Sequence, residues 1–130
     1  KKFKKLDIPY KGSYLREILV LVEESDGRKL YTDEKNLLFD ILSAINLNVN
    51  DVAIVSYSKS GNDFNGLCSK FEPKKIICFG VEPKSDYIKM NEVQEIGNIK
   101  LVMTEPLSKL LTNKELKKKL WIALKDDFMS

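Results

Sequence analysis

The sequence contains no histidine, only two cysteines and no long apolar run, and each absence excludes a class of protein. Without histidine the chain has no Ser-His or Cys-His catalytic pair and no histidine-containing zinc site. Cys68 and Cys78 cannot supply four zinc ligands, and they do not form a CxxC pair. No apolar run approaches the roughly 20 residues that cross a bilayer. We therefore expect no metal site, no cofactor and no membrane partner.

The excess of positive charge is also small. The chain of 130 residues has 22 Lys and Arg against 19 Asp and Glu, a net charge of +3, which is too low for a protein that coats nucleic acid. The basic start, Lys1 to Lys5, leads into Leu6-Asp7-Ile8-Pro9 and not into the apolar segment of a signal peptide. We expect a cytoplasmic protein with a single α/β domain at 16–130, preceded by an N-terminal arm at 1–15.

Apolar runs alternate with helical periodicities along the rest of the chain. Unbroken apolar runs predict buried strands at 18–22, 52–55 and 76–79. The stretch 99–103, apolar except for Lys100, predicts a fourth strand. Apolar residues at helical spacing predict three helices, which begin near Thr32, Asp63 and Thr112. We expect Thr112 and Glu115 to form the capping box of the last helix, and a short edge strand near Ile88 to Met90.

This order of elements predicts the fold class. Strands that alternate with helices favour a parallel sheet joined by right-handed crossovers, with helices on both faces. We therefore expect a three-layer α/β/α sandwich with a mostly parallel sheet of four to five strands.

Ligands of such sheets bind beyond the carboxyl ends of the strands. The loop Ser58-Lys59-Ser60-Gly61-Asn62 combines hydroxyls, an amine and a glycine before a predicted helix, as weak anion-binding loops do. The motif G-x-x-x-x-G-K-[ST] is absent, so an ordinary loop that caps the helix is the simpler interpretation. A small enzyme or a nucleotide-binding domain built on this chain would use Lys59, Ser60 and the loop of Glu105.

Two other groups of reactive side chains have simpler structural interpretations. Glu23, Glu24 and Asp26 follow the first strand and offer carboxylates to a metal ion, but adjacent strand residues point to opposite faces. Cys68 and Cys78 lie in apolar patterns, and no histidine is present to lower their pKa. We expect a solvated turn and two buried thiols.

The predicted last helix is a candidate partner-binding surface. Its spacing places Trp121 on the buried side with a ridge of apolar residues, Leu116, Leu120, Leu124 and Phe128. On the other side Ile122 lies among Lys118, Lys119 and Lys125, which is either a solvated face or a surface for an acidic protein or a nucleic-acid backbone.

The N-terminal arm is the second candidate partner-binding surface. The run Lys1-Lys2-Phe3-Lys4-Lys5 suits a solubilising tail or a segment that becomes ordered on a partner. Its lysines, like those of the last helix, also allow weak contact with nucleic acid.

Three stretches resemble the psi subunit family of bacterial DNA polymerase III. They are Lys75 to Gly80, Thr104 to Leu110 and Asn113 to Trp121, and Asp126-Asp127-Phe128 matches the family's acidic end. The resemblance covers about the last 60 residues, judged by eye. It implies a non-catalytic adaptor that joins the clamp loader through its N-terminal arm and pairs with a chi subunit, which contacts single-strand-binding protein.

Psi subunits share the α/β/α fold of uracil-DNA glycosylases, so the resemblance also implies that fold. Met103-Thr104-Glu105-Pro106-Leu107-Ser108 is similar to the glycosylase loop H-P-S-P-L-S, with Met103 at the place of the catalytic histidine. A thioether donates no hydrogen bond to a uracil anion. The glycosylase motif G-Q-D-P-Y-H is replaced by Val22-Glu23-Glu24-Ser25-Asp26. The resemblance therefore implies the fold without the glycosylase chemistry.

Overall fold

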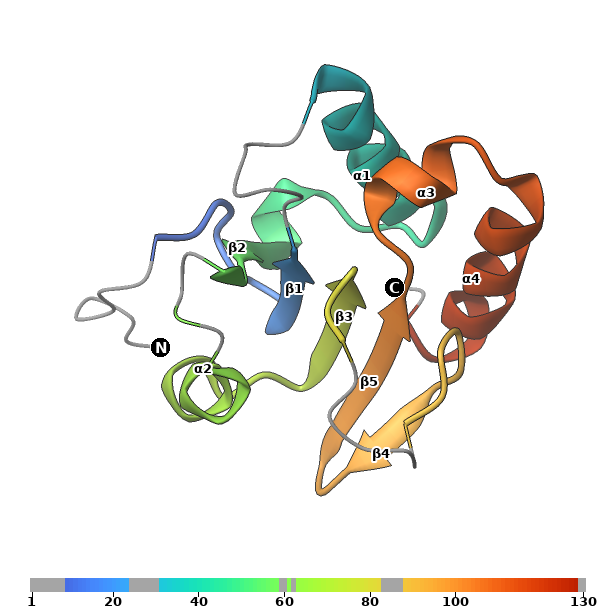
Figure 1. Ribbon diagram of the computed structural model, residues 1–130. Helices are drawn as coiled ribbons and strands as arrows, with labels where there is room; N and C mark the ends of the chain where they lie inside the picture. The colour runs from blue at the N-terminus through green and yellow to red at the C-terminus, as the bar shows by residue number, and fades with distance from the viewer. Residues whose placement is uncertain (1–8, 24–30, 59–60, 62, 83–87, 129–130) are drawn as a thin grey trace.

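A five-stranded sheet forms the centre of the protein in the computed structural model, which describes residues 9–23, 31–58, 61, 63–82 and 88–128 (Figure 1). The strand order is β2-β1-β3-β5-β4, with the first four strands parallel and β4 antiparallel to β5. The strands are β1 (Ile18–Val22), β2 (Val52–Ser56), β3 (Lys75–Phe79), β4 (Gln94–Ile96) and β5 (Ile99–Thr104). The expected mostly parallel α/β sheet is confirmed.

Helices cover both faces of the sheet. The described helices are α1 (Thr32–Ala44), a 3₁₀ turn (Val49–Asp51), α2 (Phe64–Phe71), α3 (Leu107–Leu111) and α4 (Lys114–Asp127). Buried residues of α1, α3 and α4 pack on one face and those of α2 on the other, which Figure 1 shows as helices on opposite sides of the strands. None of the helices in the described part of the chain is long and apolar enough to cross a membrane.

The unbroken apolar runs exist because helices cover both faces of the central strands. All five residues of β1 are buried. Val20 packs toward α1, α3 and α4, whereas its neighbours Leu19 and Leu21 pack toward α2, since successive strand side chains point to opposite faces. A strand buried on both faces must be apolar at every position, which is what the sequence pattern predicts.

The strand order places a topological switch point between the carboxyl ends of β1 and β3. The chain leaves β1 toward β2 on one side and returns to β3 on the other, so the connecting helices α1 and α2 lie on opposite faces. Backbone hydrogen bonds tie the ends together: Glu23 N–H donates to the Phe79 carbonyl at 2.9 Å and Gly80 N–H to the Thr104 carbonyl at 2.9 Å. Gly80 has φ +77°, and a Cβ there would lie 3.2 Å from Pro106. The chain is thus closely packed where β3 and β5 end.

The edge strand lies later in the sequence than predicted. Ile88 and Met90, expected in a strand, pack against the core on the α2 face instead. The strand is β4, which turns into β5 through Gly97 and Asn98. Gly97 has φ +61°, the backbone conformation that two-residue hairpin turns require. The dipeptide Gly-Asn was the sequence signal for this hairpin, and the apolar pattern near Ile88 concealed it.

The predicted capping box of the last helix is also wrong. The side chain of Asn113, not of Thr112, caps α4 by accepting a hydrogen bond from Leu116 N–H at 3.1 Å. Thr112 ends α3, a five-residue helix that the sequence pattern did not predict. Leu107 and Leu110 lie on the buried side of α3, so one apolar turn is enough to hold this short helix against the core.

The described part of the segment assigned to the arm packs against the domain. Lys11 pairs with Ile54 at the outer edge of β2 through two backbone hydrogen bonds of 3.0 and 2.8 Å. Tyr14 is 3% exposed, and its hydroxyl donates to the Phe71 carbonyl at 3.0 Å. Residues from Lys11 to Tyr14 therefore cover the edge strand and the end of α2.

Candidate functional site

Of the predicted anion-binding loop, the structure describes Ser58 and Gly61. Ser58 is half-buried and Gly61 is exposed, whereas Lys59, Ser60 and Asn62 lie outside the described residues. The helix that follows begins with its own cap: Asp63 accepts a hydrogen bond from Gly66 N–H at 2.9 Å. A carboxylate thus occupies the start of α2, where an anion would otherwise find free N–H groups.

Of the other predicted strand-end residues, the structure describes Glu23 and Glu105. Glu23 is half-buried at the end of β1, and Glu24 and Asp26 lie outside the described residues. Glu105 forms an ion pair of 3.4 Å with Lys109 one turn later. Among the residues that the structure describes, no group of three or more Cys, Asp and Glu side chains could hold a metal ion.

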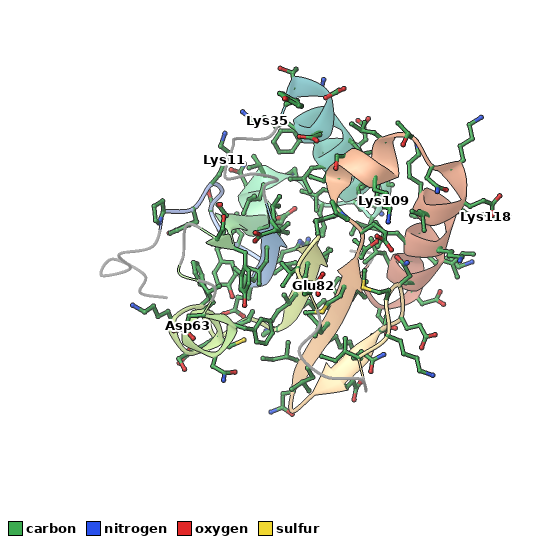
Figure 2. The ribbon with its side chains drawn as sticks, in the orientation of Figure 1. Lys11, Lys35, Asp63, Glu82, Lys109 and Lys118 are labelled. Atoms are coloured by element: carbon green, nitrogen blue, oxygen red, sulfur yellow. The ribbon has the colours of Figure 1, made fainter. Side chains whose placement is uncertain are left out.

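A hollow of about 260 Å³ lies on the α2 face at the carboxyl ends of the strands. Its apolar wall includes Leu101 and Met103 of β5. Its polar groups come from the start of α2 and from the residues after β2 and β3, and Figure 2 labels two of them, Asp63 and Glu82. The hollow is lined by Tyr57, Asp63, Phe64, Asn65, Val81, Glu82, Ile88, Leu101 and Met103. With carboxylates and no described cation in its lining, it suits a cationic or hydrogen-bond-donating ligand better than a phosphate.

Burial favours the neutral form of Tyr57 beside the hollow and of the two cysteines on the same face of the sheet. Burial, reinforced by Cys78, raises the pKa of Tyr57, against a hydrogen bond with the Phe64 backbone. Burial also raises the pKa of Cys78, which is 0% exposed in β3, and of Cys68 in α2. Both sulfurs are therefore held as thiols, the form that is a poor nucleophile.

The second candidate surface is α4, whose buried ridge is confirmed with one exception. Leu120, Leu124 and Phe128 are buried and Leu116 is half-buried against the core, but Trp121 is 38% exposed. Ile122 is 51% exposed, as the sequence pattern predicted. Trp121 lies at the border of the buried stripe, where neither sheet nor helix covers the whole indole.

Three predicted lysines of α4 are exposed. Lys118, Lys119 and Lys125 all point away from the core, and Figure 2 shows Lys118 on the outer side of the helix. The lysines of the N-terminal arm cannot be placed beside them, because Lys1, Lys2, Phe3, Lys4 and Lys5 lie outside the described residues.

A shallow apolar groove of about 80 Å³ separates α1 from α4. Its lining, which the sequence did not single out, is Ile41, Ala44, Lys117, Leu120, Trp121 and Leu124. Leu120 and Leu124 form its buried floor. Trp121 and Lys117 border it on the α4 side and Ala44, an exposed residue, on the α1 side.

The position of α4 is fixed at its C-terminal end by two lysines from the sheet. Lys75 donates a hydrogen bond to the Asp127 carbonyl and lies 5.6 Å above the Phe128 ring. Lys100 pairs with the Asp127 carboxylate at 2.8 Å. Burial and the nearby Lys100 lower the pKa of Lys75, whereas the hydrogen bond to Asp127 raises the pKa of Lys100. Positive charge at a helix C-terminus also stabilises the helix dipole.

Comparison with known proteins leaves the two surfaces, hollow and helix, without a relative to interpret them. No protein-family model matches this chain, and a search of the curated proteins found no match.

Proposed function

We propose that this chain is a non-catalytic protein–protein adaptor of DNA replication, with the glycosylase-like fold and the role of a psi subunit. The observation that carries the proposal is the exposure of Trp121 and Ile122, at 38% and 51%, on α4. Large apolar side chains on a helix surface are costly to leave in water and are enriched where proteins bind one another.

The stretches that resemble psi subunits also support the proposal by their place in the fold. The stretch that ends at Trp121 forms the first half of α4, and the stretch from Thr104 leads through α3 to it. The resemblance thus lies on the helices that carry the exposed apolar residues, and the sheet beneath them serves as a scaffold.

The residue at the place of the glycosylase histidine also fits a protein without glycosylase activity. Met103, at the place where the resemblance puts the catalytic histidine, is 4% exposed and has no titratable group. Pro106 packs against Gly80 beside it, where an added Cβ would lie 3.2 Å from Pro106.

The working surfaces in this proposal are the basic arm and the lysine-rich face of α4, acting in the cytoplasm. The arm contributes Lys1, Lys2, Phe3, Lys4 and Lys5, and α4 contributes Lys118, Lys119 and Ile122. The partners are clamp-loader or other replication proteins, with weak contact to nucleic acid through the lysines.

Retention of purified clamp-loader proteins by the immobilised chain tests the proposal. We expect the intact chain to retain them and a chain that lacks residues 1–8 to lose most of that retention. The deletion stops at residue 8 because Lys11 pairs with β2 and belongs to the fold. Absence of retention by the intact chain refutes the adaptor function, and equal retention by the shortened chain refutes the role of the arm.

The hollow beside Met103 supports a second candidate, a small enzyme or ligand-binding domain. Its volume of about 260 Å³ is near the lower end of small-molecule sites, ~300 Å³. Its carboxylates, Asp63 and Glu82, favour an amine over a nucleotide or another anion. Thermal unfolding with nucleotides and with organic amines tests this candidate: stabilisation by an amine that is lost in Glu82→Gln supports it, and no stabilisation by either class rejects it.

A further inference from the structure

We propose that the groove between α1 and α4 binds an acidic segment of a partner protein, which inserts one aliphatic side chain beside Trp121. The inference rests on the proposed adaptor function and names the chemistry of the partner. It adds a contact on the Trp121 side of α4 to the surface around Ile122 that the sequence pattern indicated.

The groove contains a preformed apolar pocket, called the seat below, that can hold a side chain of a partner. Leu120 and Leu124 make its floor, and Ile41 and Ala44 form its α1 side. Its volume is about 80 Å³, and Lys117 is the one charged residue in its lining. So small an apolar space suits an aliphatic side chain. Because Lys75 and Lys100 fix the end of α4, the seat forms without ordering the helix on binding.

Lysines surround Trp121 on its own helix. They occupy the positions i−7, i−4, i−3 and i+4, which at 100° per residue lie within about 60° of Trp121. These residues are Lys114, Lys117, Lys118 and Lys125. Lys117 is half-buried in the groove and the other three are exposed. In the described part of the chain, none of the four forms an ion pair with a carboxylate.

The acidic residues of α4 lie elsewhere on the helix. Glu115 and Asp126 are roughly 120–140° away from Trp121, on the side of Ile122. Asp127 is about 120° away on the other side, where it pairs with Lys100. Ile122 therefore has Glu115 and Asp126 as near neighbours along with its lysines, and its surroundings are nearly balanced in charge. Trp121 is the exposed apolar residue of α4 whose neighbours on the helix surface are positive, so it is the place where an acidic segment gains the most.

Two other occupants fit the groove less well. A second copy of the chain related by a two-fold axis at the groove would bring the lysines around Trp121 against the same lysines. A nucleic acid would satisfy the lysines but leave the narrow apolar seat empty, since sugar and phosphate groups do not fill it. An acidic segment with an aliphatic side chain uses both the charge and the seat.

Trp121 is the single tryptophan of the chain, so its fluorescence reports on the groove directly. The probe is a short peptide of glutamates and leucines, compared with one in which glutamine replaces glutamate and one in which serine replaces leucine. We expect the first peptide to shift Trp121 emission to the blue and to bind at least ~10-fold more tightly than the other two. We also expect its binding to weaken steeply between ~50 and ~500 mM salt.

Two matched substitutions on α1 locate the contact. Ala44→Glu places a carboxylate in the groove, whereas Ser43→Glu makes the same charge change at the adjacent exposed position outside the lining. We expect Ala44→Glu to lower the affinity for the acidic peptide about tenfold. We expect Ser43→Glu to leave that affinity nearly unchanged. Thermal unfolding verifies that both variants fold. Lys117→Glu, with Lys70→Glu on α2 as its control, repeats the comparison from the α4 side.

Several results would overturn the inference. Equal binding of the glutamine peptide removes the charge preference, and equal loss in Ser43→Glu removes the groove. Self-association that Ala44→Glu abolishes assigns the groove to a second copy. Tighter binding of a single-stranded oligonucleotide than of the peptide assigns it to nucleic acid.

Clamp-loader retention by the same variants separates this inference from the proposed function. Peptide binding without retention of clamp-loader proteins leaves the groove site standing and refutes the replication role. Retention of clamp-loader proteins without peptide binding supports the replication role and refutes the groove site.

Discussion

Replacement of Tyr14 by phenylalanine tests how the N-terminal segment is held, and it does so through the pH dependence of stability. Tyr14 is 3% exposed, and its hydroxyl donates to the Phe71 carbonyl at 3.0 Å. Tyr14→Phe keeps the ring, which packs edge-on against Phe71, and removes the hydroxyl with its hydrogen bond to Phe71. A net loss of about 1 kcal/mol in the free energy of unfolding is expected at pH 8.

The loss shrinks as the pH rises. Burial, reinforced by Glu17, raises the pKa of Tyr14 far above its ordinary value of 10.0, so the folded protein keeps the phenol proton while the unfolded chain loses it. The unfolded state then binds fewer protons, and stability falls above pH 10. At pH 11, ionisation of one unfolded tyrosine removes about 1.4 kcal/mol from the wild type and nothing from Tyr14→Phe. The two proteins should therefore be nearly equally stable near pH 11.

Urea unfolding followed by circular dichroism between pH 8 and 11 measures both effects. Tyr10→Phe is the control, because Tyr10 is 37% exposed, also packs edge-on against Phe71, and has no hydroxyl hydrogen bond in the described part of the chain. We expect it to follow the wild type within ~0.5 kcal/mol at every pH. If Tyr14→Phe is as stable as the wild type at pH 8, or declines just as steeply toward pH 11, the account of Tyr14 is wrong.

Three further predictions concern α4 and the core. Asn113→Ala should cost about 1 kcal/mol of unfolding free energy by urea titration, because it removes the cap of α4; a larger loss in Thr112→Ala would reinstate the predicted capping box. Leu124→Ala should cost roughly 2–5 kcal/mol in the same assay, since Leu124 is buried, while Ile122→Ala, on the exposed side, should change it by less than ~0.5 kcal/mol. Cys78 should resist thiol reagents in the native state, because burial raises its pKa; labelling as fast as in urea would contradict its burial.

Most of the fold was predictable because its signals are local. The apolar runs of β1 and β3 have the unbroken pattern of strands covered on both faces, and the spacing of Leu38 and Leu42 defines the buried side of α1. The two misplaced features, the hairpin at Gly97 and the short helix from Leu107, depend on too few residues to show a period. At the hairpin the turn residue Gly97 carried the signal that periodicity lacked.

The candidate sites were predictable in part. The lysines of α4 and the exposed Ile122 followed from helical spacing. The polar loop before α2 predicted an Asn or Asp cap for that helix, and Asp63 provides it. The hollow beside Met103 did not follow, because Tyr57, Glu82 and Leu101 come from three separate stretches of the chain. Such a cavity is defined by distances across the sheet, which no local pattern contains.

The sequence by itself determined the α/β architecture, because apolar residues must be buried and their spacing states which side of each element is covered. Only the tertiary structure decided which residues at the border of a buried side remain exposed to solvent. Trp121 has the spacing of a core residue, yet α1 and α4 leave a groove between them and the indole is 38% exposed. The distance between two packed helices depends on all the side chains between them, so the surface at Trp121 arises from packing and not from the pattern of α4 alone.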